Sequence, residues 1–327
     1  MVAKTRWGIL GTGWIADLFV KDLLLTGHTV TAVGSRSQAS ADRFAARFGI
    51  PHAHASYESL AADPEVDVIY VATPHPMHAA NAKMALTAGK HVLIEKPFTL
   101  NAGEAEEVVA LAEANRLVVL EAMWTRFLPH MVNVRKVVAS GVLGELRSVI
   151  ADHTQDLPDD PAHRLNALEL GGGALLDLGI YPISFAWDIL GEPQSIQATA
   201  TFKTTGADAE VATLFQYGSG AIALTLSASD TAGPNRATVI GTEGRIEIDR
   251  VWYEPTSFRV YDSKNRVIRE FKSAIVGRGM QFEADETERL ILAGMTAGDI
   301  MPPSETVAIM RTLDTIRSQI GLKYPDE

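Results

Sequence analysis

The chain has 327 residues, and this length predicts two domains, each able to bury a hydrophobic core. Hydrophobic residues make up 46% and charged residues 21% of the composition, as in an ordinary soluble globular protein. The net charge is -11, and no basic run offsets it. Nucleic acids and anionic membranes are therefore excluded as expected partners, because both need a basic face.

Cysteine is absent, which excludes disulfide bonds and thiolate catalysis and fits a reducing cytoplasm. The first predicted strand begins close to Met1, so we expect no signal peptide. No apolar stretch approaches the ~20 residues that span a bilayer. We therefore expect a cytoplasmic protein.

Residues 4 to about 121 alternate short β-branched runs with helical patterns, which predicts a doubly wound parallel sheet of the α/β class. We assign residues 1–122 to this dinucleotide-binding domain. Asn101 is the expected N-cap of its last helix, before Glu104. The predicted strands cover residues 28–34, 66–72, 91–94 and 117–120, and the helices cover 38–48, 77–88 and 101–114.

Residues 123–327 change to strands in succession, separated by glycine-containing turns, which predicts a large and mostly antiparallel sheet. Helices are expected before and after these strands. The predicted strands cover residues 195–203, 209–217, 221–227, 236–240 and 245–248, and the helices cover 129–140, 173–190, 280–293 and 304–320.

A Gly-x-Gly-x-x-Ala turn follows the first strand directly and favours binding of a dinucleotide pyrophosphate. Gly11 permits the tight turn, Gly13 leaves room for the phosphates, and Ala16 lets the helix pack close to the strand. The N–H groups of the first helical turn, where Trp14 and Ile15 follow Thr12 and Gly13, face the anion. A glycine-rich turn in another α/β unit is the alternative.

The second strand ends in Ser35 and Arg36, where an NAD-specific domain carries an acidic residue for the ribose 2'-hydroxyl. A hydroxyl and a guanidinium suit a 2'-phosphate instead, because arginine offers a planar fork of donors. We predict NADP(H) as the cofactor, with NAD(H) as the second choice. The alternative is that Arg36 is a solvated loop residue.

Other candidate cofactor contacts follow the fourth and sixth strands. Thr73 and Pro74 are expected to line the adenosine-to-ribose side, with His78 in the next helix. Trp124 would form an apolar wall near the nicotinamide, and Arg126 would hold carboxamide or substrate oxygens, although packing at a domain interface is the alternative for both. His75 and His78 can also be interpreted as a metal pair.

The segment Glu95-Lys96-Pro97 follows the fifth strand, and ligands bind at the carboxyl ends of parallel strands. Lys96 is therefore aimed at the cofactor, where its ammonium can hold a substrate hydroxyl. A surface lysine after a strand is the alternative.

An acidic segment with Asp152, His153, Asp156, Asp159, Asp160 and His163 offers oxygen and imidazole ligands. We set a metal site aside here, because acidic loops are usually solvated and the spacing matches no motif of defined metal geometry. His163 and Arg164 are candidate substrate contacts, since the loop leads to the glycine-rich segment 171–173.

Together these motifs resemble the Gfo/Idh/MocA family of NAD(P)-dependent oxidoreductases over nearly the whole chain. Residues 121–127 and 171–182 look like the branch of dimeric dihydrodiol dehydrogenases and NADP-dependent D-xylose dehydrogenases. The resemblance implies a Rossmann domain joined to a substrate-binding α/β domain, whose open sheet commonly mediates dimer formation. We therefore expect a homodimer.

Asp177 and Tyr181 lie four apart in a predicted helix and share one face, so both can reach one substrate. The resemblance implies Tyr181 as the general acid or base, where many relatives carry histidine, with Asp177 and Lys96 positioning the substrate oxygens. A nearby lysine would favour the phenolate. Trp124, Phe127 and His163 complete the expected substrate contacts. The alternative is that Tyr181 is an ordinary core residue.

These residues predict a dehydrogenase that transfers a hydride between NADP and a hydroxyl-bearing carbon of a xylose-like aldose or a cyclic vicinal diol. Two alternatives stay open. One is reduction of an oxo-sugar, ketone or imine, and the other is a non-catalytic sensor that binds NADP.

Overall fold

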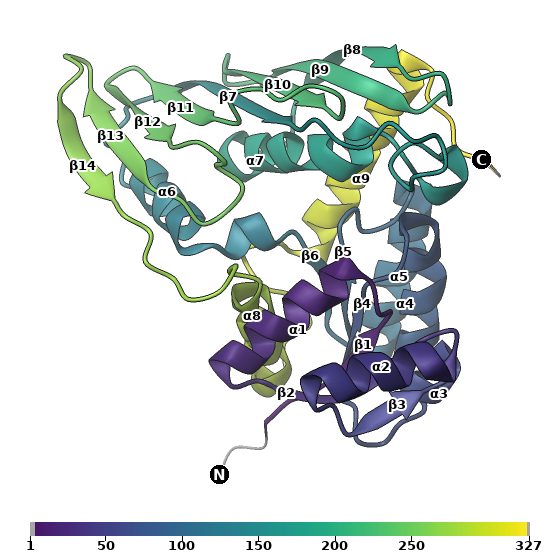
Figure 1. Cartoon of the computed structure of the whole chain (residues 1–327). Helices are drawn as coiled ribbons and strands as arrows, with labels where there is room; N and C mark the ends of the chain where they lie inside the picture. Colours follow the sequence, from purple (N-terminus) through teal and green to yellow (C-terminus); the bar gives the residue numbers. More distant parts are fainter. Residues whose placement is uncertain (1–3, 326–327) are drawn as a thin grey trace. The chain divides into compact units, whose positions relative to one another are not determined.

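The computed structural model describes residues 4–325, and the chain divides into two compact units. The first unit contains the described residues up to Trp124 together with Ile275–Val307, and the second contains Thr125–Ala274 together with the described residues from Ala308 onward. Figure 1 labels the elements of both units.

The first unit is built on a six-stranded parallel sheet with the strand order β3-β2-β1-β4-β5-β6, as the alternating sequence pattern predicts. Except for the half-buried edge strand β3, its strands are buried along nearly their whole length, which explains their mostly apolar sequences. The strands are β1 (Arg6–Leu10), β2 (Thr29–Gly34), β3 (His52–His54), β4 (Val68–Val71), β5 (His91–Glu95) and β6 (Val119–Ala122).

The helices of this unit begin and end where local signals place them. The Asn101 side chain accepts a hydrogen bond from the Glu104 N–H at 2.9 Å, which confirms the predicted N-cap of α5. The helices are α1 (Trp14–Thr26), α2 (Gln38–Phe48), α3 (Tyr57–Ala61), α4 (His78–Thr87) and α5 (Ala102–Asn115).

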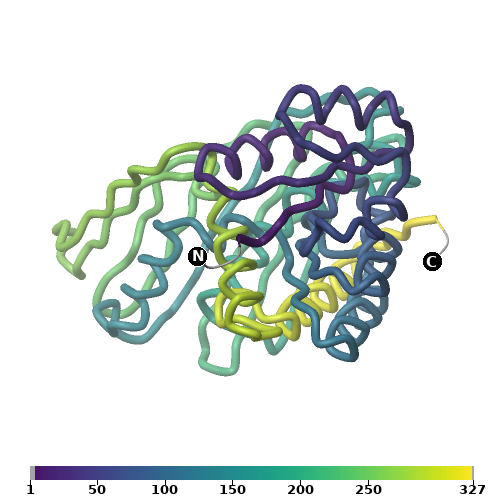
Figure 2. The backbone as a smooth tube through the Cα atoms, turned by 90° about the horizontal axis from the view of Figure 1, so that it is seen from below, coloured from purple at the N-terminus to yellow at the C-terminus, as the bar shows by residue number. Residues whose placement is uncertain are grey.

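A later segment of the chain completes the first unit, although the division made from sequence counted it with the second domain. Helix α8 (Gln281–Ala293) lies beside α1 in Figures 1 and 2. The Glu288 carboxylate binds the Trp7 indole N–H at 2.8 Å and the His28 ring at 2.9 Å. The Asp22 carboxylate accepts backbone N–H groups of residues 278–280. Buried polar contacts therefore hold this segment to the first unit.

The second unit contains an eight-stranded sheet with the order β14-β13-β12-β11-β7-β10-β9-β8. The pairing is antiparallel except between β7 and β10, which confirms the predicted, mostly antiparallel sheet. The strands are β7 (Leu146–Thr154), β8 (Ser195–Phe202), β9 (Asp208–Gln216), β10 (Ile222–Ala228), β11 (Ala237–Gly241), β12 (Gly244–Ile248), β13 (Phe258–Asp262) and β14 (Val267–Phe271).

Helices α6 (Pro129–Ala139) and α7 (Ile180–Leu190) belong to this unit, and α9 (Pro303–Ile320) begins in the first unit and continues in the second. Helix α7 packs against β7 and β10. The segment Leu168–Leu190 has 23 residues and is apolar enough to cross a membrane, which corrects the expectation that no apolar stretch reaches this length. Because 83% of its most apolar window is buried, it is a core helix and fits a soluble protein.

The structure corrects the interpretation of the acidic segment. Asp152 and His153 do not lie in a loop but on β7, inside the second sheet. His153 is 2% exposed, and the Asp152 carboxylate accepts the backbone N–H groups of Asn235 and Arg236. His153 is therefore a core residue, and the Asp152 carboxylate is bound by the backbone next to it. The acidic segment is divided between β7 and the loop that follows it.

Candidate cofactor and substrate site

The turn after β1 has the geometry that a bound pyrophosphate requires. Gly11 has φ +109°, and a Cβ there would lie 2.8 Å from the Ala72 carbonyl oxygen, so only glycine fits. Gly13 is the N-cap of α1 and supplies no side-chain cap, and a Cβ at Gly13 would meet nothing within 4 Å. The start of α1 thus has no side-chain cap, which suits an anion site at a helix N-terminus.

Arg278 lies beside this turn, and the sequence analysis missed it. Its guanidinium carbon is 5.8 Å from the ring centre of Trp14 and 5.0 Å from that of Trp124. The Trp14 side chain is 67% exposed, which is unusual for tryptophan. Arg278 therefore joins the start of α1 to Trp124, two residues after β6, within the first unit. No local pattern marks this arginine, because it is brought here by contacts with Asp22 from far along the chain.

The corner after β2 places Ser35 and Arg36 at the expected position. Ser35 is buried and its backbone N–H donates to the His54 carbonyl at 3.1 Å, whereas Arg36 is exposed. Burial raises the pKa of Tyr57, and the nearby positive charge of Arg36 offsets part of this rise. The corner thus presents a guanidinium next to a phenol.

His78 is the first residue of α4, as predicted, but its ring lies inside the unit. Its ring is fully buried, with Nδ1 2.8 Å from the Pro97 carbonyl and Nε2 2.8 Å from the Thr73 carbonyl. Burial lowers the pKa of His78. Both ring nitrogens are engaged by the backbone, so His78 braces the ends of β4 and β5 against each other, which argues against a direct cofactor contact and against a metal pair with His75.

The carboxyl end of β5 carries Lys96, and Glu95 before it is anchored inside the unit. One Glu95 oxygen accepts the Tyr70 hydroxyl, and the other lies 3.2 Å from the Lys96 backbone N–H. Burial raises the pKa of Glu283 well above its usual range, and the nearby carboxyl groups of Glu95 and Asp22 add to this rise. Glu95, 6% exposed, fixes the turn that presents Lys96.

In the second unit, Asp177 and Tyr181 begin the core helix. A π-helical turn over Leu175–Gly179 carries Asp177, and α7 continues with Tyr181. Such turns are frequent at functional sites. Arg164 Nη1 lies 3.5 Å from Asp177 Oδ1, so the loop before the glycines reaches this carboxylate. The role of Asp177 and Tyr181 stays a prediction, but their positions one turn apart agree with it.

Asp208 on β9 holds the start of this helix. Its Oδ2 accepts the Leu175 N–H at 2.6 Å, and a Cβ on Gly173, which has φ +133°, would lie 1.9 Å from Asp208 Oδ1. Burial raises the pKa of Asp208 to about 6, although the N–H of Leu175 lowers it. The glycine triplet thus serves a purpose that the sequence did not reveal, because Gly173 makes room for a buried carboxyl group.

Aromatic rings surround Tyr181 within the same unit. The His153 ring lies edge-on to Tyr181 at 4.8 Å and stacks on Tyr253 at 3.7 Å. Burial raises the pKa of Tyr253 to about 12, so its hydroxyl stays protonated. Tyr253 was missed from the sequence, and His153 was considered only as a metal ligand. His153 was hard to assign because Arg147 and Asp152 interrupt the apolar pattern of β7.

The partners of Arg126 argue against the predicted contact with carboxamide or substrate oxygens. It is 2% exposed, and it donates to Ser184 Oγ at 2.9 Å and to Asp188 Oδ1 at 3.0 Å, both on α7. Its guanidinium is therefore used inside the second unit. Phe127 is also buried, at 4% exposure. His163 Nδ1 accepts the Leu165 N–H, and this contact stays within its own loop.

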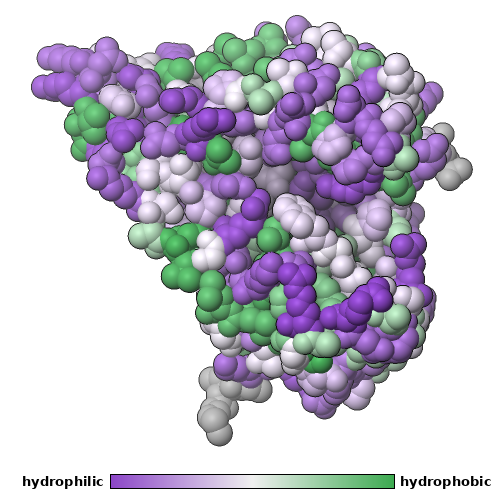
Figure 3. Space-filling view, in the orientation of Figure 1, coloured by the Kyte–Doolittle hydropathy of each residue, from purple (hydrophilic) through white to green (hydrophobic). Residues whose placement is uncertain are grey.

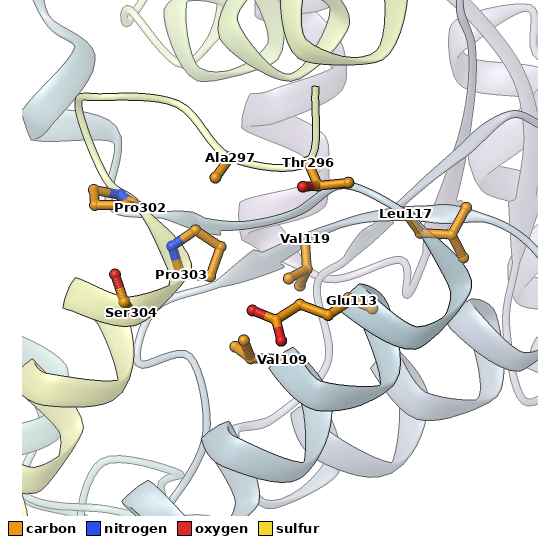
Figure 4. A pocket seen from close by; sticks show the side chains of 10 residues that line it. Val109, Glu113, Leu117, Val119, Thr296, Ala297, Pro302, Pro303 and Ser304 are labelled. Atoms are coloured by element: carbon orange, nitrogen blue, oxygen red, sulfur yellow. The ribbon is translucent and has the colours of Figure 1, made fainter. Parts of the chain in front are cut away.

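A small cavity of about 110 Å³ lies in the first unit, beside the edge strand β6 of the parallel sheet (Figure 4). It is lined by Leu117 and Val119 at the start of β6, by the end of α5 and by residues 296–304. Ligands of open α/β sheets bind at the carboxyl ends of the strands, whereas this cavity lies near the amino end of β6. It is therefore separate from the turn of residues 11–13 after β1, the expected phosphate turn.

Comparison with known proteins places this geometry in a family. Residues 5–123 match the oxidoreductase family model with an NAD-binding Rossmann fold, and residues 131–247 match the GFO/IDH/MocA C-terminal domain. The chain belongs to the GFO/IDH/MocA oxidoreductase family. The predicted cofactor class, fold and enzyme class agree with this membership.

Relatives extend the similarity over the full chain. Trans-1,2-dihydrobenzene-1,2-diol dehydrogenase of Mus musculus is 36% identical, with 98% of both chains covered. D-xylose 1-dehydrogenase (NADP(+)) of Hypocrea jecorina is 33% identical, covering 98% of this chain and 93% of its own. The solved structure of KijD10, a 3-ketoreductase from Actinomadura kijaniata in complex with NADP and TDP-benzene, is 27% identical with a TM-score of 0.84, covering 97% of this chain and 98% of its own.

Proposed function

We propose that the protein is an NADP-dependent dehydrogenase that acts on a hydroxyl-bearing carbon of a xylose-like aldose or a cyclic vicinal diol. The observation that carries the proposal is the placement of Asp177 and Tyr181 one turn apart at the head of α7, beside His153 and Tyr253. The dihydrodiol and D-xylose dehydrogenases among the relatives support the substrate class.

The residues of the chain divide the work by their chemistry. Tyr181 takes the hydroxyl proton during oxidation and returns it during reduction, because a phenol positioned against the reacting oxygen acts as general base or acid. Lys96 and Asp177 orient the substrate oxygens. Bound NADP supplies the hydride acceptor. Tyr253 stays protonated, so it is suited to donate a hydrogen bond rather than to accept a proton.

The cofactor contacts follow from the first unit. The N–H groups at the start of α1 hold the pyrophosphate, and Arg278 adds positive charge beside Trp14. Arg36 holds the 2'-phosphate. Replacing Arg36 with alanine should weaken NADP binding about tenfold and leave NAD binding unchanged, because the charge-assisted contact exists only with the phosphate. Equal losses for both cofactors in titration calorimetry would assign Arg36 no phosphate role.

The reaction is tested by measuring NADP reduction with a panel of aldoses and vicinal diols. Tyr181→Phe and Lys96→Met should lower turnover about 10²- to 10⁴-fold without loss of NADP binding. Tyr217→Phe is the matched control, because Tyr217 is also buried in the second unit, at 6% exposure, and no role is proposed for it. Full turnover in the Tyr181 and Lys96 variants would refute the assignment.

A second candidate is reduction of an oxo-sugar, and the similarity to the 3-ketoreductase structure favours it. The same residues serve this reaction in the reverse direction, with Tyr181 as the acid. Oxidation of NADPH by keto-sugars in the same panel separates the two, and tight NADP binding with no turnover on any substrate would indicate a sensor instead.

We also propose a homodimer formed through the outer face of the second sheet. Ile150, Ile222 and Leu224 are 44%, 38% and 41% exposed on neighbouring strands, with Leu224 opposite Ile150. Figure 3 shows hydrophobic side chains along the upper rim of this unit. Such a patch marks an interface. Leu224→Arg should shift the sedimentation profile from dimer to monomer.

The absence of cysteine supports a cytoplasmic location.

A further inference from the structure

Three metal-ligating side chains meet at the edge strand of the first unit, outside the proposed active site. His52 Nδ1 and His54 Nε2 lie 2.7 and 2.8 Å from the same oxygen, Oδ2 of Asp63. The three ligand atoms all lie within 4.8 Å of one another. We infer that His52, His54 and Asp63 form a binding site for a divalent transition-metal ion of the zinc type.

The chain builds this cluster in a simple way. His52 and His54 are two apart on β3, so both side chains leave the same face of the strand. Asp63 follows α3, and its second oxygen is held by the Glu65 N–H at 2.8 Å. The carboxylate is therefore oriented independently of the two rings. Metal sites commonly orient a ligating side chain through a second hydrogen bond of this kind.

The donor set selects the class of ion. Two imidazole nitrogens with one carboxylate oxygen suit Zn²⁺ and its neighbours in the transition series, whereas Mg²⁺ and Ca²⁺ prefer oxygen ligands. Zinc bonds of about 2.1 Å place tetrahedral ligand atoms about 3.4 Å apart. The observed separations of 2.7 and 2.8 Å are hydrogen-bond lengths, so the rings must withdraw by roughly half an ångström to admit the ion.

Exposure and charge agree with an ion that exchanges with solvent. The His52 side chain is 40% exposed and that of His54 is 23% exposed, whereas that of Asp63 is only 4% exposed. The open side leaves room for water as a further ligand. Lys90 donates to the carbonyls of Asp63 and Val66 at 2.7 Å, so a positive charge stands behind the carboxylate and weakens the attraction. Bound metal would tie β3 to the segment after α3.

Zinc titration of the full chain tests this site independently of the proposed reaction. Protein freed of metal with a chelator is titrated with ZnCl₂ by calorimetry, and CoCl₂ is used in parallel because bound Co²⁺ gives a visible spectrum. The wild-type chain should bind one equivalent. His52→Ala and His54→Ala should each weaken binding at least about tenfold, because each removes one of three ligands. Circular dichroism checks that both variants fold.

His163→Ala is the matched control, because His163 lies in the acidic loop that offers the competing ligand set. It should bind zinc as the wild type does, and zinc should raise the melting temperature of the wild type and of this control but not that of His54→Ala. The inference is overturned if the wild type binds no zinc, if both β3 variants bind it unchanged, or if the His163 variant alone loses it. NADP turnover plays no part in these measurements.

Discussion

Asp208 is predicted to make the stability of the second unit depend on pH between about 4 and 6. Its carboxyl group is fully buried, and burial raises its pKa from 3.8 to about 6. The folded state therefore keeps a proton that the unfolded chain has released, and stability falls as pH rises through this range. A shift of about two units corresponds to roughly 3 kcal/mol.

Two substitutions separate charge from hydrogen bonding. Asp208→Asn keeps an oxygen for the Leu175 N–H but cannot ionise, so its unfolding free energy should gain on the wild type by roughly 3 kcal/mol between pH 4 and pH 7. Asp208→Ala removes the acceptor and leaves the Leu175 N–H buried without it, which costs about 1–3 kcal/mol.

Urea denaturation at pH 4, 5, 6 and 7 measures both effects, and the difference between variant and wild type cancels the titration of all other acids. Parallel curves for Asp208→Asn and the wild type would refute the reasoning, because they would show that Asp208 ionises as freely in the folded as in the unfolded chain. NADP turnover of the asparagine variant then reports whether the start of the Tyr181 helix has moved.

Three further predictions use other charged groups. Arg126→Met should lower the unfolding free energy by about 2 kcal/mol, because it removes one of the two arginines that bind the buried Asp188 and leaves only Arg135, and an unchanged melting curve with weaker cofactor binding would restore the cofactor role. Arg278→Met should weaken NADP binding about tenfold at unchanged stability, as titration calorimetry can show. Although burial lowers the pKa of His28, Asp285 and Glu288 raise it to about 9. The ion pairs of His28 should therefore add about 1–2 kcal/mol to the unfolding free energy after solvent screening, fully below pH 6.5, and this contribution is lost as pH rises through 9. Urea denaturation checks it, because His28→Ala should not show this loss.

The first unit could be predicted from sequence because its signals are local. Its buried parallel strands are mostly apolar, and the Asn101 cap and the Gly11 turn each act within a few residues. Strands with polar faces were harder. β7 was missed because Arg147, Asp152 and His153 interrupt its pattern, although it is the strand that joins β11 to β10. β13, β14 and the three-residue β3 were missed as well.

Side-chain roles failed where the deciding partner is distant in the chain. Arg126 and Arg278 carry the same guanidinium group. Arg126 follows β6, a strand expected to end near the cofactor, whereas no sequence motif precedes Arg278. Asp188, 62 residues away from Arg126, uses that guanidinium inside the core. Asp22, 256 residues away from Arg278, holds the backbone that brings the second arginine to the phosphate turn. A motif can therefore place a charge near a site, but only the fold decides which groups its side chain meets.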